Sequence, residues 1–151
     1  MDREGGFTLI EVVCVLAIIA LIAALVLPAL PRATSQARLA GYAVDVAALL
    51  KGDRNAAIRN HAMVSTALDA DRRTVRSGYR AALVELPADV TFSALLAQRC
   101  ADRIVGSTID FFPSGASCGG VIAISRQGFG YQVRVNWLTG GVEVVAIGKT
   151  S

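Results

Sequence analysis

The chain has 151 residues and a formal net charge of +3, and 54% of its residues are hydrophobic. This length fits one modest domain with a short appendage, and the apolar share exceeds that of an ordinary soluble domain. The weakly basic balance does not by itself indicate a nucleic-acid-binding protein.

The apolar excess lies mainly in an N-terminal run, because residues 12–31 contain no charged residue. A helix needs about 20 mostly apolar residues to span a membrane. A cleaved secretory signal fits less well, since the start "MDREGG" carries two acids against one arginine and the apolar stretch is too long. We therefore predict that residues 7–31 form a transmembrane helix.

The carboxylate of Glu11, at the head of this run, needs a partner. An isolated acid in lipid costs about 2.5–3.5 kcal/mol on insertion scales. If the chain is cut between Gly6 and Phe7, the new α-amine of Phe7 lies one helical turn before Glu11. Between parallel copies, Glu11 of one chain can meet the amine of the next, and the cost of burying an unpaired charge would then set their register.

The sequence "GFTLIEVVCVLAIIALIAALVLP", from Gly6 to Pro28, resembles the class III leader of type IV pilins and type II secretion pseudopilins. The resemblance implies that 1–6 is a leader peptide, which a prepilin peptidase removes between Gly6 and Phe7. It also implies methylation of the Phe7 amine, an assembly role for Glu11, and a helix kink at Pro28.

The leader departs from the family in its charge. Arg3 is accompanied by Asp2 and Glu4, and further arginines follow the apolar run. The positive-inside rule therefore does not place the N-terminus in the cytoplasm, and the orientation rests on the resemblance.

The segment 32–62 resumes helical spacing and predicts an amphipathic continuation of the same helix, ending near His61. We expect one helix from Phe7 to His61, bent or loosened by its prolines. His61, the only histidine, is expected to cap the helix or face solvent. The apolar stripe comprises Leu39, Tyr42 or Ala43, Val46, and Leu49 or Leu50, whereas Arg38, Asp45, Lys51, Asp53 and Arg54 are expected on the surface.

The segment 63–151 reads as a β-rich globular domain, which makes the fold class α+β: a long N-terminal helix packed on a small antiparallel sheet. In the stretch 131–137, alternation predicts that Trp137 faces the core. Gly140 and Gly141 are expected to adopt positive φ in the next turn. Strands are expected over 63–69, 90–96, 108–112, 120–126, 131–137 and 142–147, with a polar connection over 71–83.

The C-terminal stretch resembles the domain of H-type minor pseudopilins and fimbrial-T-type minor pilins. The two resemblances together cover both ends of the chain, whereas residues 64–105 share only a general pattern of short strands and turns with the family. The matching residues are Phe112, Pro113, Gly115, Gly119, Gly120, Trp137, Leu138, Thr139 and Gly140.

This resemblance implies a minor pseudopilin of the type II secretion system, a non-enzymatic subunit of the periplasmic pseudopilus that helps export folded proteins across the outer membrane. The implied partners are the major and other minor pseudopilins, the prepilin peptidase, the inner-membrane secretion platform, and membrane lipid before assembly. The implied location is the bacterial inner membrane, with a single span, a cytoplasmic N-terminus and a periplasmic domain. The alternative is a minor type IV pilin that acts in pilus assembly or DNA uptake, with or without binding DNA itself.

Two of the three cysteines, Cys100 and Cys118, lie in the globular part, and Cys14 lies in the apolar run. In an oxidising compartment Cys100 and Cys118 are the natural disulfide pair. Two buried free thiols are the alternative.

No set of residues predicts an enzyme, a metal site or a cofactor. The cluster of Arg72, Arg73, Arg76 and Arg80 beside Tyr79 is a candidate contact for DNA phosphates or an acidic partner. The alternative is a solvated loop beside neighbouring aspartates. The C-terminal tail offers only one lysine, which weighs against nucleic acid as a partner.

Overall fold

The computed structural model describes residues 8–26 and 33–148. The chain divides into two compact units, Met1–Ala33 and Thr34–Ser151. Because each unit has its own internal contacts, we describe each by itself.

The first unit contains helix α1, Leu9–Val26. Glu11, in its first turn, is its only charged residue, and apolar side chains surround the helix on every face. Among the described residues, no helix combines the length and the hydropathy that a membrane crossing requires.

The second unit begins with helix α2, Gln36–Asn60. The Ser35 hydroxyl caps its N-terminus by accepting a hydrogen bond from the Arg38 N–H at 3.3 Å. At the other end His61 adopts the left-handed conformation (φ 50°), and its N–H reaches the carbonyls of Ala57 and Ile58. His61 thus caps the C-terminus of α2, as expected from the sequence.

The expectation of one uninterrupted helix over 7–61 is wrong at residues 33–35, which are not helical. The backbone of Ser35 is extended (ψ 162°). The Asp89 carboxylate accepts hydrogen bonds from the N–H (2.8 Å) and the hydroxyl (2.9 Å) of Thr34. These bonds hold the chain in a capping conformation rather than in a helical turn. The kink expected at Pro28 lies outside the described residues.

Ten antiparallel strands follow α2 in the described part of the chain. They form one sheet in the order β3-β2-β1-β7, a second in the order β10-β9-β8-β4, and a small β5-β6 pair. The strands are β1 Val64–Asp69, β2 Thr74–Arg76, β3 Leu83–Glu85, β4 Thr91–Leu96, β5 Arg99–Cys100, β6 Arg103–Ile104, β7 Thr108–Phe111, β8 Gly120–Arg126, β9 Phe129–Val135 and β10 Val142–Ile147.

Two sequence expectations for strands need correction. The polar connection over 71–83 contains β2 and the first residue of β3, because Val75 is buried while its neighbours remain polar. The strand expected over 131–137 runs from Phe129 to Val135. Gln127 and Gly128 alone form the preceding turn, both with positive φ, as a two-residue hairpin requires.

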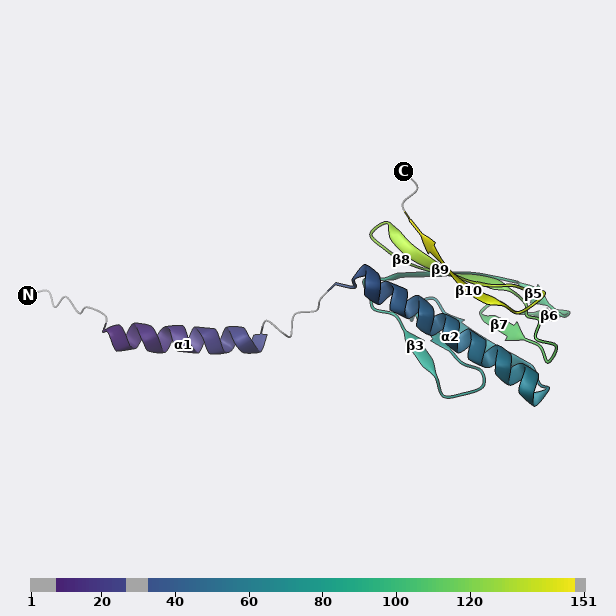
Figure 1. The fold of residues 1–151 in the computed structure, drawn as a ribbon, viewed down its shortest axis with the longest axis horizontal. Helices are drawn as coiled ribbons and strands as arrows, with labels where there is room; N and C mark the ends of the chain where they lie inside the picture. The colour runs from purple at the N-terminus through teal and green to yellow at the C-terminus, as the bar shows by residue number, and fades with distance from the viewer. Residues whose placement is uncertain (1–7, 27–32, 149–151) are drawn as a thin grey trace, which may run out of the picture. The chain divides into compact units, whose positions relative to one another are not determined.

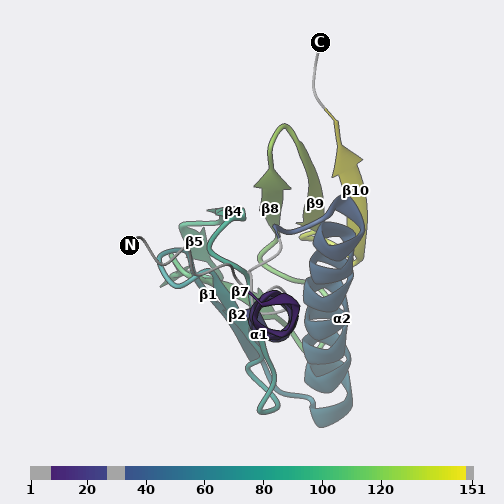
Figure 2. The ribbon, with the colours of Figure 1, turned by 90° about the vertical axis from the view of Figure 1, so that its left-hand side faces the viewer.

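Helix α2 packs against strands of both sheets, with β3 along one flank and β10 along the other (Figure 1). Figure 2 shows β8, β9 and β10 beside the helix, with β1 and β2 in the other sheet. The second unit therefore buries a core of its own. Its largest fully buried apolar side chains are Phe111, Leu39, Leu50, Ile109, Ile122, Ile124, Val46, Val75 and Val133.

A disulfide joins Cys100 to Cys118, with the Cα atoms 5.6 Å apart. This is the pair that the sequence favours, and it ties the β5-β6 hairpin to the segment that leads into β8. Cys14 is free and exposed on α1.

Candidate functional site

Glu11 lies in the first turn of α1, where the structure leaves it exposed. Its backbone N–H donates to the Thr8 carbonyl at 3.0 Å, and a carboxylate in this position interacts favourably with the helix dipole. Gly6, Phe7 and Pro28 lie outside the described residues. Cleavage, methylation and the kink therefore stay predictions.

The surface of α1 is apolar except at Glu11. Its large side chains, from Leu9 (83% exposed) to Ile22 (55%), are more than half exposed or close to it. A helix that is apolar on all sides is stable only when lipid or other protein covers it. The exposed apolar surface of α1 thus carries one charged residue, Glu11.

The start of the second unit is held by Thr34, Asp89 and Arg126. The Arg126 Nε lies 2.9 Å from an Asp89 oxygen, and its Nη1 donates to the Thr34 carbonyl at 3.0 Å. Hydrogen bonds from the backbone and the hydroxyl of Thr34 lower the pKa of Asp89, and the Arg126 charge lowers it further. These contacts fix the point at which the chain enters the globular unit.

The expectation that Asp53 lies on the helix surface is wrong, because its side chain is fully buried. Its carboxylate accepts hydrogen bonds from the hydroxyls of Thr66 (2.7 Å) and Ser77 and from the Gly78 N–H (3.0 Å). Asp53 thereby joins α2 to β1 and to the connection that follows β2. The helical periodicity of the sequence could not reveal that Asp53 is buried, because its hydrogen-bond partners lie 13 to 25 residues away.

The two turns that carry the C-terminal family motif meet at Arg54 of α2. Its Nε donates to the carbonyls of Gly115 (3.0 Å) and Thr139 (3.1 Å). Gly115 and Gly140 both have positive φ, and a side chain at Gly140 would overlap the Gly115 carbonyl. The motif glycines therefore serve close backbone packing. Gly141, also expected at positive φ, does not adopt it.

The prediction that Trp137 fills the core is wrong, since its side chain is 67% exposed, and that of Leu138 is 64% exposed. Strand β9 ends at Val135, so the alternation no longer applies. The Asn136 side chain instead accepts hydrogen bonds from the N–H groups of Leu138 and Thr139, which turns the chain outward.

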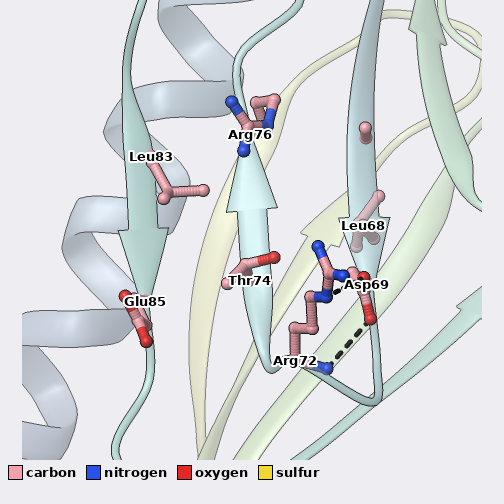
Figure 3. Close-up of a pocket in the computed structure, with 8 residues that line it drawn as sticks. Leu68, Asp69, Arg72, Thr74, Arg76, Leu83 and Glu85 are labelled. Atoms are coloured by element: carbon pink, nitrogen blue, oxygen red, sulfur yellow. Dashed lines mark hydrogen bonds and ion pairs between the residues drawn. The ribbon is translucent and has the colours of Figure 1, made fainter.

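The arginine cluster does not converge on one site. Arg72 turns to Asp69, with 3.7 Å between Nε and Oδ2, while Arg76 lies at the other end of β2 (Figure 3). Both line an open hollow of about 620 Å³ together with Glu85. Arg80 instead borders a second hollow beside α2, and Arg73 is half-buried. Nearby acids thus offset part of the positive charge.

Within 8–26 and 33–148, no group of three or more His, Cys, Asp or Glu side chains is placed to hold a metal ion. His61 is exposed at the end of α2, apart from Asp53 in the core.

Known proteins resemble the chain at both levels, sequence and fold. Residues 1–27 match the family described as the prokaryotic N-terminal methylation motif. The chain is 30% identical over 139 residues to "Type II secretion system protein H" of Xanthomonas campestris pv. campestris, a match that covers 91% of this chain and 80% of that protein.

Two solved structures share the fold of the globular unit. The minor pseudopilin EpsH from the type 2 secretion system of Vibrio cholerae matches with a TM-score of 0.57 and 13% identity, covering 72% of this chain and 96% of that chain. The type IV minor pilin FimU of Pseudomonas aeruginosa matches with a TM-score of 0.56 and 15% identity, covering 74% and 91%. Since the sequence relationship extends over most of both chains, this chain belongs to the type II secretion system protein H family.

Proposed function

We propose that this protein is a minor pseudopilin, a subunit of the type II secretion pseudopilus that helps export folded proteins across the outer membrane. The observation that carries the proposal is the 30% identity to a type II secretion system protein H over nearly the whole chain. The fold shared with the minor pseudopilin EpsH is consistent with it.

Processing prepares the subunit for assembly. A prepilin peptidase cuts between Gly6 and Phe7 and methylates the new amine, and the match of residues 1–27 to the methylation motif supports this step. The amine then lies within one helical turn of Glu11. In the filament, Glu11 pairs with the Phe7 amine of a neighbouring subunit and sets the register between them.

Assembly is the transfer of an apolar helix from lipid to protein. Before assembly, residues 7–31 anchor the chain in the inner membrane, with the N-terminus in the cytoplasm and the globular unit in the periplasm. The exposed apolar surface of α1 then packs against the helices of the major and other minor pseudopilins, on the inner-membrane secretion platform.

The globular unit acts as a rigid body rather than as an enzyme. Its disulfide, the buried Asp53 and the Arg54 contacts hold helix, sheets and turns in one arrangement. A body of this kind presents a fixed surface to neighbouring subunits, and the subunit itself makes or breaks no covalent bond.

Deletion of the gene in the bacterium that encodes it tests this role. We expect secreted proteins to accumulate in the periplasm and a plasmid copy to restore their export. Twitching and DNA uptake should not change. Normal export with lost twitching or DNA uptake would contradict the proposal and favour a type IV minor pilin, for which the shared fold of FimU is the present support.

A further inference from the structure

Strand β4 is an outer strand of its sheet, and its outer edge has no backbone partner in the described part of the chain. In the described part of the chain, no backbone hydrogen bond joins Thr91–Leu96 to any segment other than β8. Every second residue of such a strand directs its N–H and C=O away from the sheet. The edge therefore offers a row of donors and acceptors that an extended strand can complete.

The other edges are short, charged or covered. Strand β3 has three residues and includes Glu85. The Asp110 carbonyl of β7 accepts a hydrogen bond from the Cys118 N–H at 3.0 Å, and Phe111 bridges to Ser117. Strand β10 carries Glu143 and borders α2.

Strand β4 has none of the sequence features that prevent an edge strand from pairing with another chain. Its sequence "TFSALL" holds six residues with no charge, proline or glycine. Leu95 is 77% exposed on its outward face, and Ser93 and Ala94 are exposed as well. Natural proteins usually protect an edge of this length with a charge, a proline or a bulge.

We propose that β4 pairs antiparallel with β4 of a second copy of this chain, and so joins two four-stranded sheets into one. This interface belongs to the globular unit and goes beyond the proposed function, on which it does not depend. The strand is its own complement when the twofold axis passes midway between the Ser93 residues of the two copies.

That register keeps each side chain on the correct face of the sheet. Ser93 lies opposite Ser93 of the second copy, and Thr91 lies opposite Leu95, so the outward residues pair with outward residues. On the inner face, the buried Phe92 lies opposite the exposed Ala94. No two like charges face each other in this register, because the strand carries no charge.

Charge substitutions at the twofold position test the pairing. The globular unit 34–151 is suited to the experiment because it has its own core, its own disulfide and both caps of α2. Its mass is measured by analytical ultracentrifugation over a range of concentrations, with circular dichroism as the check on folding. We expect a dimer for the unaltered unit.

Ser93→Lys and Ser93→Asp each place two like charges opposite one another, and each should raise the dissociation constant at least about tenfold. An equimolar mixture of the two variants should dimerise again, because the lysine then faces the aspartate. The matched control is Ala146→Lys, at an exposed residue of β10 on the other side of the same sheet, which should dimerise like the unaltered unit. A unit that stays monomeric, or a mixture that does not recover, would overturn the proposal.

The full chain in the bacterial envelope provides the second readout. Ser93→Cys, combined with Cys14→Ser, leaves one free thiol, because Cys100 and Cys118 are paired. Mild oxidation should yield a covalent dimer of this chain. A cross-link to a different protein would show that another partner occupies the edge, and would overturn pairing between two copies.

Discussion

Asp53 joins three segments of the globular unit through the two oxygens of one buried carboxylate. Asp53→Ala leaves the hydroxyls of Thr66 and Ser77 and the Gly78 N–H without their acceptor in the core. We expect the free energy of unfolding to fall by about 3 kcal/mol or more, as measured by urea denaturation of residues 34–151. Asp45→Ala, on the exposed side of the same helix, is the control and should change stability by less than about 0.5 kcal/mol. Equal effects of the two substitutions would contradict this role of Asp53.

Asp89 makes stability depend on pH in a defined direction. Its pKa in the folded unit lies below the ordinary value of 3.8, so the unfolded chain takes up the proton first as the pH falls. The stabilisation is present above the unfolded value and is lost as the pH falls through the lower folded value. The difference in unfolding free energy between the unaltered unit and Asp89→Asn should therefore shrink from neutral pH to about pH 3. A difference that does not vary with pH would refute the prediction.

In our proposal, the Glu11 carboxylate sets the register between neighbouring subunits of the filament. Glu11→Ala should leave cleavage at Gly6 intact but impair incorporation into the filament, because each contact would then bury an unpaired amine at a cost of about 3 kcal/mol. Immunoblots of sheared filaments and of membranes measure the two steps separately. Val12→Ala, at the neighbouring apolar position, should have little effect on either. Normal incorporation of the Glu11→Ala variant into the filament would contradict this role of Glu11.

Single residues were predictable where their function depends on local sequence. His61 follows the last turn of α2 and caps it, as expected from its position alone. The burial of Asp53 was not predictable, because its hydrogen-bond partners are distant in the sequence. The exposure of Trp137 was not predictable either, because it depends on the end of strand β9 at Val135. The motif glycines could be recognised from the family resemblance, but only the structure shows that Arg54 holds their turns together.

At the scale of elements, the disulfide supports the β5-β6 hairpin. It closes a loop with a sequence separation of 18, which stabilises the fold by about 3 kcal/mol through chain entropy. Cys100→Ala combined with Cys118→Ala should lower the unfolding free energy of residues 34–151 by about this amount, in urea titrations. Cys14→Ser should not affect the globular unit in the full chain. Mass spectrometry that finds both thiols free in the native protein would contradict the pairing.

The amphipathic stretch of α2 was predictable because its apolar residues recur every three or four positions. The interruption at residues 33–35 was not, since it depends on Asp89 and Arg126, which lie far along the sequence. Strands β1 and β8 lie close to their predicted bounds, whereas the stretch 131–137, chosen for its alternation, leaves the strand after Val135. The short strands β2 and β3 escaped prediction because polar residues flank their few apolar ones.

At the scale of the whole molecule, the two units differ in how they treat apolar surface. The apolar surface of α1 requires cover from lipid or other helices, whereas the globular unit has a complete core of its own. The sequence predicted this division because charge is absent from 12–31 and frequent after it. Membership in the protein H family supports our proposal that the chain acts in secretion.

The central claim is that proteolysis places a free amine beside Glu11 and converts an anchored chain into a filament subunit. N-terminal sequencing and mass spectrometry of the protein from the native envelope test it most directly. We predict a mature protein that begins with N-methylated Phe7. A mature protein that begins at Met1, or at any residue other than Phe7, would contradict the account.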